Sequence, residues 1–484
     1  MKKAFKIAYA ALFFAVCATP LALMPFVKSN AEIEKKALTE MPSFISDGKI
    51  NTDFSTQFES WFNDRLPLRS QLLSAANLVK GELLTSPSSN VISGSDGWIF
   101  FDTDKLDYMN TNAMTDNQIR SMAVTISLIE ENVKGKNGSF TFVPMPNKAS
   151  VYDEYFPSCY KKADENNYTR LCAQLDDLGV NYVDMLKVMR ENKSSDIYHK
   201  RDSHWNYLGT LIGYNAIMDS LGKPHKTYDG VSYKLEKDWR GDLDKLLYPS
   251  GGFMDYQYHF DIEYQPFRFT VPVGVSDVQS QLETFMSDKE ENDSRIGTAN
   301  SGKTDNARLY MVRDSFGRAL LPFMIDNYKT CMFVRTDCPE LSLVPQGGDM
   351  VYEIVERNLS NVIATAPFMF APERSEVPAA AENGGEISTV CSDEGYAVRV
   401  YGALPEDLPV GDGRMYVKLT GGNGDHIFEA FPIYEKKLLE GDGKNGFSMM
   451  IDPSLGLSGD FEITVYAGGK VFTGTKATLT ADTQ

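Results

Sequence analysis

The sequence predicts an α/β fold, with a mostly parallel sheet flanked by helices and an all-β, sandwich-like domain at the C-terminal end. Three observations lead to this prediction. Helical and strand-like segments alternate between residues 115 and 183, as in proteins with a parallel sheet. A stretch rich in Pro, Ala, Glu and Gly at 371–385 then interrupts the pattern. Beyond it, short runs of alternating apolar residues are separated by glycine-rich turns.

The first helix of the alternating region is predicted to start at a capping box over 115–118 and to continue to Val133 on an apolar stripe. A strand-like segment at 139–143, a helix over 168–178 and a second strand-like segment at 180–183 follow. Ligands of such sheets bind beyond the carboxyl ends of the strands. Polar residues that directly follow a strand are therefore candidates for a functional site.

Other segments are predicted from turn signals and composition. Asp96-Gly97 ahead of an aromatic run indicates a hairpin. The polar stretch 287–304 lacks periodicity and is predicted to be a surface loop. The C-terminal domain is predicted to contain strands at 397–401, 415–419, 426–428, 447–451 and 461–466.

The N-terminus and the overall charge predict a protein outside the cytoplasm. Lysines at 2, 3 and 6 precede an uncharged, mostly apolar run over 7–26, which is an export signal long enough to span a bilayer. Ser29-Asn30-Ala31 offers a cleavage-type site, whereas the length of the apolar run favours an uncleaved anchor. The net charge of -18 argues against nucleic-acid binding through a general basic surface.

At 484 residues, the chain is predicted to contain several parts. Helical apolar stripes after the anchor indicate a membrane-proximal region that packs on the domain that follows. The predicted parts are an anchor at 1–30, a helical membrane-proximal region at 31–90, an α/β domain at 91–370, a linker at 371–385 and a β domain at 386–484.

The six cysteines are too few for a fold built on disulfides. Cys159 with Cys172 and Cys331 with Cys338 form local pairs that can close in an oxidising compartment, and unpaired thiols fit the sequence equally well. No Cys or His cluster has the spacing of a structural zinc site, and no metal or cofactor is expected. A metal site that uses Asp202 and His204 is a weaker alternative, because no further ligands stand at suggestive spacing.

Two short motifs carry the chemistry. Asp202 and His204 are two residues apart just before a predicted helix, so that the acid can orient the imidazole. Far downstream, Ser315 follows an apolar strand-like segment and precedes a helix-like run. A serine at such a turn exposes its Oγ and aims its own N–H at a developing oxyanion. Alone, each motif is more often a helix cap, but together they have the residue types of an acid-base-nucleophile triad.

Both motifs resemble those of the SGNH-hydrolase-like proteins typified by the alginate O-acetylation proteins and the bacterial DHHW proteins. That family shares a D-x-H-W motif, here 202–205, and a later D-S-F serine, here 314–316. Arg313 departs from the family, in which a Gly-Asp-Ser pattern is commoner. Further stretches that resemble the family are EKKALTEMP (34–42), FESWFNDRLPLR (58–69), GSDGWIF (94–100), PMPNKASVY (144–152), GDL (241–243) and DMVYEIVER (349–357).

Four more residues are candidates for substrate or oxyanion contacts: Asn147, Lys148, Trp205 and Arg313. Asn147 carries an amide donor directly after a predicted strand, and its alternative role is to cap the turn after Pro146. Trp205 either walls an acyl pocket or packs beneath the helix that follows.

The resemblance implies a polysaccharide O-acetyltransferase or acetylesterase at the cell envelope. Both reactions pass through an acyl-enzyme, so the sequence leaves transfer and hydrolysis open. The resemblance also implies a polysaccharide acceptor and a membrane-bound O-acyltransferase partner as acetyl donor. The alternative is a non-catalytic cell-surface protein that binds glycans or serves as a scaffold.

Overall fold

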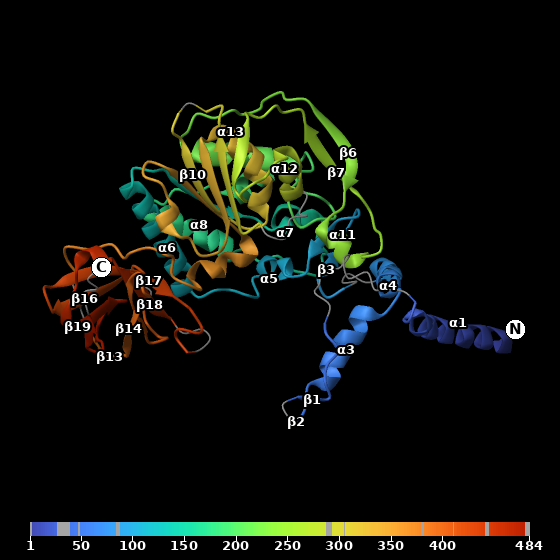
Figure 1. The fold of residues 1–484 in the computed structure, drawn as a ribbon, viewed down its shortest axis with the longest axis horizontal. Helices are drawn as coiled ribbons and strands as arrows, with labels where there is room; N and C mark the ends of the chain where they lie inside the picture. The colour runs from blue at the N-terminus through green and yellow to red at the C-terminus, as the bar shows by residue number, and fades with distance from the viewer. Residues whose placement is uncertain are drawn as a thin grey trace.

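The computed structural model describes residues 2–26, 39–46, 49–83, 88–286, 293–303, 305–378, 382–409, 411–440 and 445–479. They form an N-terminal arm, an α/β body and a C-terminal all-β region (Figure 1). The cleavage-type sequence at 29–31 lies outside the described residues. All six cysteines are described, and none forms a disulfide.

A six-stranded sheet forms the centre of the α/β body. Its strands, in spatial order, are β5 (Phe140–Met145), β12 (Asp349–Val355), β10 (Arg308–Arg313), β11 (Thr330–Arg335), β9 (Arg295–Asn300) and β8 (Phe267–Val271). The first four pair in parallel, whereas β9 and β8 pair antiparallel to their neighbours. The body is therefore a mixed α/β fold with a parallel core. β5 and β12 are buried along their whole length, as the continuous apolar runs of a parallel sheet require.

Helices surround this sheet, and the predicted capping box is present. Thr115 Oγ1 accepts the N–H of Gln118, and the side chain of Gln118 accepts the N–H of Thr115. The second predicted strand, at 180–183, is reduced to one bridge between Phe142 and Tyr182. The main helices of the body are α6 (Asp116–Gly135), α8 (Asn167–Leu178), α9 (Met185–Asn192), α10 (Tyr207–Ser220), α12 (Val278–Met286) and α13 (Leu321–Asn327).

The prediction of a surface loop over 287–304 is wrong for part of that stretch. Residues 295–300 form β9, which pairs with β11 through main-chain bonds. β9 has few apolar side chains to signal a strand, and its polar Thr298 and Asn300 are nevertheless buried. Long-range pairing thus overrode the local composition. Residues 287–292 and 304 lie outside the described residues.

The C-terminal all-β region is confirmed, and all five predicted strands are present. Its strands form one nine-stranded sheet, in which β17 pairs first with β16 and then with β18. The sandwich-like packing stays a prediction. The strands are β13 (Glu382–Glu386), β14 (Thr389–Asp393), β15 (Val398–Ala403), β16 (Met415–Gly421), β17 (His426–Ile433), β18 (Gly446–Ile451), β19 (Gly459–Ala467), β20 (Lys470–Thr473) and β21 (Ala477–Leu479).

This region packs on the body through α6. Phe431 and Ile433 of β17 belong to the same hydrophobic core cluster as the body. Arg374, inside the predicted linker, forms ion pairs with Glu131 of α6 and Glu429 of β17. Arg374 thus ties the start of the predicted linker to both parts. Residues 379–381 lie outside the described residues. The predicted boundary between the domains stays a prediction.

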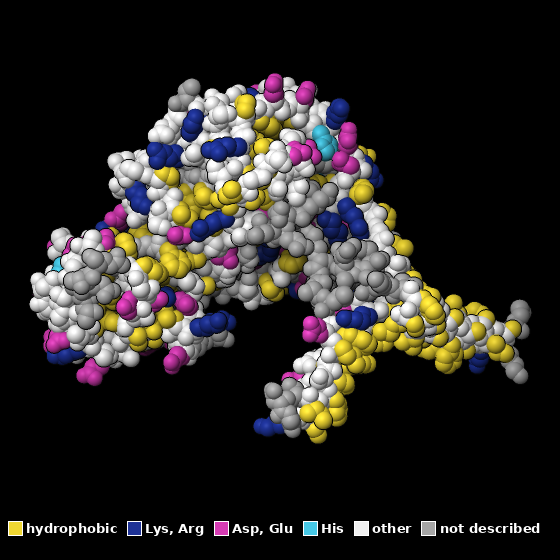
Figure 2. All heavy atoms as spheres, in the orientation of Figure 1, with side chains coloured by type: hydrophobic (Ala, Val, Ile, Leu, Met, Phe, Trp, Pro, Cys, Tyr) yellow, Lys and Arg dark blue, Asp and Glu magenta, His cyan; other side chains and the backbone are white. Residues whose placement is uncertain are grey.

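The N-terminal arm is mostly exposed. Ala4–Leu23 of α1 (Lys2–Leu23) is long and apolar enough to cross a membrane. The hairpin of β1 (Ile45–Ser46) and β2 (Lys49–Ile50) and the helix α3 (Phe54–Arg65) project from the body, with apolar side chains along them (Figures 1 and 2). By contrast, α4 (Arg69–Leu83) packs on the body, where Asn77 donates to the carbonyl of Leu247.

Candidate active site

Ser315 lies one residue beyond the end of β10, after Asp314, and directly precedes the 3-10 helix η2 (Phe316–Leu320). Its hydroxyl does not cap this helix. Instead, Ser315 Oγ lies 2.8 Å from His204 Nε2. Among the described residues, the backbone N–H of Ser315 has no hydrogen-bond partner, so it can donate to an oxyanion formed at a carbonyl under attack by Oγ.

Asp314 holds the turn in which Ser315 lies. One of its carboxylate oxygens accepts the N–H of Phe316 at 2.8 Å, and the other accepts the N–H of Val355 at 2.8 Å. The second bond ties the turn to the end of β12. Asp314 therefore orients the serine and does not itself contact the imidazole.

A second buried carboxylate, Glu353 of β12, supports the same turn. It accepts the N–H groups of Asp314 at 3.0 Å and Gly317 at 3.1 Å. A Cβ at Gly317 would lie 2.7 Å from the Glu353 carboxylate, so glycine is needed for this approach. Burial, and then the charge of Asp314, raise the pKa of Glu353 well above its ordinary value.

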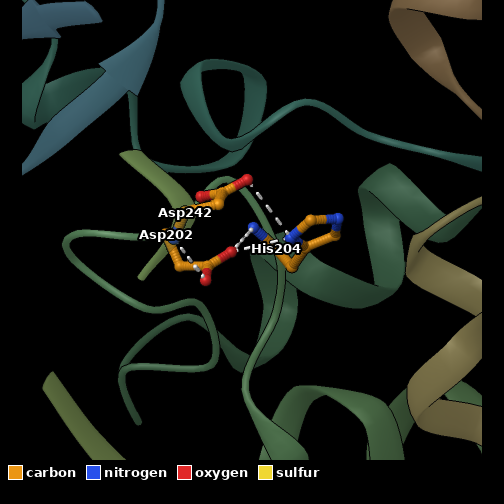
Figure 3. Close-up of side chains that lie close together, drawn as sticks. All are labelled: Asp202, His204 and Asp242. Carbon is orange, nitrogen blue, oxygen red and sulfur yellow. Dashed lines mark hydrogen bonds and ion pairs between the residues drawn. The ribbon is translucent and has the colours of Figure 1, made fainter. Parts of the chain in front are cut away.

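His204 and Asp202 lie in the turn before α10, which begins after Asn206. Asp202 Oδ1 is 2.7 Å from His204 Nδ1 and also accepts the His204 backbone N–H at 3.0 Å (Figure 3). The imidazole therefore presents Nε2 to Ser315. Asp202, His204 and Ser315, which are separated by up to 113 positions, form one hydrogen-bonded line.

The other oxygen of Asp202 is also bonded. It accepts the indole N–H of Trp239 at 2.9 Å and the backbone N–H of Asp242 at 3.0 Å. A Cβ at Gly241 would lie 2.1 Å from the carbonyl oxygen of Arg201, so only glycine admits the Asp202 turn this closely. Asp202 is thus held from two sides and kept nearly out of contact with water.

The triad opens into a cavity of about 260 Å³. Aromatic and cationic side chains wall it, among them Trp205, Trp239, Phe316 and Arg357. The Arg357 guanidinium lies 5.8 Å from the centre of the Phe316 ring. A cavity that combines a hydrogen-bonded serine, apolar walls and a cation suits a small acyl group bound beside a polar acceptor.

Comparison with protein families connects this geometry with known proteins. Residues 91–307 match the model of the family described as the SGNH hydrolase-like domain of the acetyltransferase AlgX. The chain is similar to the SGNH-hydrolase-like alginate O-acetylation proteins. This match confirms the resemblance seen in the sequence. It includes Asp202 and His204 but ends before Ser315. A comparison with curated proteins found no match.

Several solved structures are also similar. A DHHW family protein from Eubacterium siraeum shares 15% identity (TM-score 0.42), with 56% of this chain and 91% of that chain covered. The O-acetyltransferase domain of Pseudomonas putida AlgJ shares 15% identity (TM-score 0.36), with 56% and 92% covered. Bacillus cereus PatB1 shares 17% identity (TM-score 0.43), with 56% and 96% covered.

The charges within the triad reinforce one another. Burial acts to raise the pKa of Asp202, but its hydrogen bond to His204 and the nearby imidazole charges outweigh burial and hold the pKa well below the ordinary value. Burial acts to lower the pKa of His204, and the hydrogen bond and negative charge of Asp202 outweigh it, so the pKa of His204 is raised. An ionised Asp202 therefore makes the imidazole a stronger base.

A third carboxylate, Asp242, lies beside the triad and was not among the predicted site residues. Its Oδ2 is 3.7 Å from His204 Nδ1. The ligand atoms of Asp202, His204 and Asp242 lie within 4.8 Å of one another, as a metal site would need (Figure 3). However, both oxygens of Asp242 already accept bonds from Ser203, one from its N–H and one from its hydroxyl. This arrangement fits a group that fixes the turn and the imidazole.

Asn147 needs a correction, because the described residues that line the cavity do not include it. It is fully buried at the end of β5, where its Nδ2 donates to Asp107 at 2.8 Å. Its Oδ1 accepts from Arg357 at 3.2 Å. Its side chain does not cap the following turn either. The structure thus makes Asn147 a support for Arg357. Its other partner, Asp107, belongs to α5 (Asp104–Tyr108), which packs on α7 (Lys148–Val151), the helix directly after Asn147.

Lys148 also does not line the cavity. Its buried ammonium donates to three backbone carbonyls, those of His199 at 3.1 Å, Lys200 at 3.1 Å and Asp202 at 2.5 Å. Lys148 therefore fixes the turn that carries Asp202 and acts on the triad from behind. Burial lowers the pKa of Lys148 to about 8, although nearby carboxylates, Asp202 foremost, oppose the shift.

Of the remaining two candidates, Arg313 lies outside the cavity and Trp205 lines it. Arg313 is fully buried and outside the cavity, and its guanidinium donates to Asp293 at 3.2 Å. Arg313 is the last residue of β10, and its side chain points into the body, whereas Ser315 lies in the turn beyond the strand. Trp205 does line the cavity, and it also packs, because its indole N–H donates to the carbonyl of Phe316 at 3.1 Å. The two roles weighed for Trp205 coexist.

The cavity-lining residues that sequence reasoning missed include Trp239, Asp242 and Arg357. Asp242 and Arg357 each lie in a stretch that resembles the family, so the resemblance offered a signal that was not converted into site residues. Trp239 had no signal beyond being one of four tryptophans. Its role depends on a contact across 37 positions.

Proposed function

We propose that this protein transfers or hydrolyses acetyl groups on a polysaccharide outside the cytoplasm, with Ser315 as nucleophile. The observation that supports this proposal is the hydrogen-bonded line from Asp202 through His204 to Ser315, with contacts of 2.7 and 2.8 Å. The match to a family described as an acetyltransferase domain supports the choice of acyl group.

In the proposed reaction, Ser315 Oγ attacks the carbonyl carbon of an acetyl ester while His204 Nε2 takes the hydroxyl proton. Asp202 stabilises the resulting imidazolium through Nδ1. The Ser315 N–H stabilises the oxyanion of the tetrahedral intermediate. Collapse releases the donor alcohol, which receives the proton from His204, and leaves an acetyl group on Ser315.

In the second half-reaction, His204 takes a proton from a hydroxyl group that attacks the acetyl-serine. A sugar hydroxyl yields an acetylated polysaccharide, and water yields acetate. A membrane-bound O-acyltransferase is the proposed acetyl donor, in keeping with the apolar helix Ala4–Leu23 that can place the protein at a membrane. A non-catalytic glycan-binding or scaffold protein is the alternative, and it does not require the Ser315–His204 contact.

The test is the turnover of an activated acetyl ester by the full chain and by Ser315→Ala. We expect the wild type to release acetate and to carry a trapped acetyl group on Ser315, detectable by mass spectrometry of peptides. Ser315→Ala should lose turnover by at least about 10³-fold and keep its melting temperature, because Oγ contributes little to packing. Equal turnover by both proteins would favour the non-catalytic alternative.

A further inference from the structure

A two-stranded ribbon stands at the edge of the body beside the candidate active site (Figure 1). It consists of β6 (Tyr233–Trp239) and β7 (Asp255–Phe260), paired antiparallel. No other strand of the described chain pairs with it. Such an unsupported ribbon is rarely stable through its own pairing, so its attachments and its exposed face need an explanation.

The base of the ribbon is part of the catalytic apparatus. Trp239, at the end of β6, donates to Asp202 at 2.9 Å and stacks on the ring of His199 with an interplanar angle of 3°. Gln257 of β7 is buried, and its amide nitrogen lies 3.2 Å from His199 Nε2. The catalytic cavity and the ribbon are therefore joined through these three side chains.

The outer face of the ribbon carries aromatic rings that remain in water. Register pairs Tyr233 with Phe260 and Leu235 with Tyr258, and alternation places Tyr256 on the same face. Tyr233 and Tyr256 are 54% and 55% exposed. The rings of Tyr233 and Tyr258 lie 5.1 Å apart. A row of exposed aromatic side chains usually indicates a binding surface, because rings that remain in water contribute little to stability.

A groove of about 320 Å³ runs along this face. Leu235, Tyr256 and Tyr258 line it, together with the charged ends of Asp196 and Lys237. His199 lines both this groove and the catalytic cavity. The groove therefore lies next to the cavity that contains Ser315.

The chemistry of the groove fits a sugar chain. A pyranose ring presents C–H groups on its faces and hydroxyl groups at its edge, so it needs flat apolar surfaces beside hydrogen-bonding groups. The groove offers both, with tyrosine rings next to a carboxylate and an ammonium. A protein partner would be expected to cover a broader apolar core. No tryptophan occurs in the C-terminal β region, so that region lacks the ring best suited to sugars.

We propose that the groove beside β6 and β7 binds a chain of pyranose units and leads one of them to the catalytic cavity. The proposal rests on the proposed function, because the bound chain would be the acceptor of the acetyl group. It assigns Tyr256 and Tyr258, which line the groove, to glycan binding, and Tyr233, whose ring lies 5.1 Å from that of Tyr258, to an extension of the same surface. It also predicts that longer acceptors are used better than a single sugar, since only they reach both the groove and Ser315.

The first measurement is binding, made in the Ser315→Ala background so that it does not depend on chemistry. Calorimetry is carried out with a neutral β-glucan hexamer and with a hexuronate hexamer, which distinguishes uncharged from anionic chains. At least one hexamer should bind, and Tyr233→Ala with Tyr256→Ala should weaken it by about tenfold, the loss expected for two ring contacts. Tyr256→Ala alone should give a smaller loss in the same direction.

The second measurement is transfer, made with Ser315 intact. The ratio of acetyl transfer to the hexamer over transfer to a monosaccharide should fall by about tenfold in the double variant. Tyr396→Ser is the matched control, since this tyrosine is 51% exposed on the C-terminal region and should leave the ratio unchanged. A melting temperature near that of the wild type shows that the ribbon is intact.

Two results overturn the glycan proposal: neither hexamer binds, or binding and the transfer ratio are the same with and without the two tyrosines. Failure of the proposed function looks different. In that case hexamer binding still depends on the tyrosines, but the wild type shows no acetyl-serine and no transfer to any acceptor. That pair of results would keep the groove as the site of a non-catalytic glycan-binding protein.

Discussion

The turns after β5 and β10 lie at the same edge of one sheet, because both strands run in parallel with β12. Their polar side chains nevertheless differ in whether they face the cavity. After β10, Ser315 points into the cavity and contacts His204. After β5, Asn147 and Lys148 are buried and bonded to the protein. A position just beyond the carboxyl end of a strand therefore does not by itself place a polar side chain in the cavity.

The segments that pack over each strand end decide the outcome. After β5, α5 packs on α7 (Lys148–Val151), and carbonyls around Asp202 accept hydrogen bonds from the ammonium of Lys148. After β10, Ser315 contacts His204 directly, and both side chains line the cavity. As a result, the turn after β10 carries the proposed chemistry, and the turn after β5 supports it from behind.

The largest expected effect concerns the triad that contains Ser315, in the turn after β10. Asp202→Asn should reduce the rate of ester turnover by about 10⁴-fold, because an amide favours the wrong imidazole tautomer and leaves the imidazolium unstabilised. The residual activity should also require less alkaline conditions, since the pKa of His204 falls when the negative charge is removed. The measurement is a pH profile of kcat for an activated acetyl ester.

Folding is the control for that experiment, and it is checked by the melting temperature at one pH. A loss smaller than about tenfold, with the fold intact, would remove Asp202 from the proposed mechanism. The two turns would then differ only in exposure and not in chemistry.

A smaller effect on activity is expected from Lys148→Met, in the turn after β5. The substitution keeps the length of the side chain and removes donors to three carbonyls, so it should lower the melting temperature by roughly 5 °C or more. It should also reduce kcat, because the Asp202 turn is no longer held, while KM for a small ester changes little. Lys245→Met, at a cavity-lining lysine, is the comparison variant. A rise in KM with unchanged stability would return Lys148 to the substrate contacts first predicted.

The smallest expected effect concerns pH and uses two buried acids, one near each turn. Burial, partly opposed by Arg357, raises the pKa of Asp104 on α5 to about 7. Because this value exceeds the ordinary one, the stability that Asp104 contributes is present below about pH 4 and is lost as pH rises through 7. Asp202 has a lowered pKa and behaves in the opposite way: its contribution is present above its ordinary pKa of 3.8 and is lost on acidification.

Asp104→Asn mimics the protonated acid and should flatten the fall in melting temperature between about pH 4 and pH 7, the two pKa values of Asp104. The measurement is a series of thermal melts of wild type and variant across that range. If the two curves of melting temperature against pH remain parallel, Asp104 does not titrate in this range, and its protonated form does not stabilise the region around the turn after β5.

The sequence by itself determined the local devices. The capping box at Thr115 depends on neighbours in the chain, as do the Asp202–His204 pair and the strand-turn-helix around Ser315. Periodicity and short-range hydrogen bonds report such features because each is complete within a few residues. The resemblance to the family could be read from the same short motifs, and the family comparison confirmed it.

Tertiary structure decided which polar groups share the site. Asp242 reaches Asp202 across 40 positions, and Arg357 reaches Asn147 across 210. Tertiary structure also made residues 295–300 a strand, through pairing with β11. Contacts of this range leave no local pattern, because burial and the covering segments determine whether a polar group faces a cavity or another protein group. Ser315 could thus be predicted from its turn, whereas the role of Lys148 could be seen only in the folded chain.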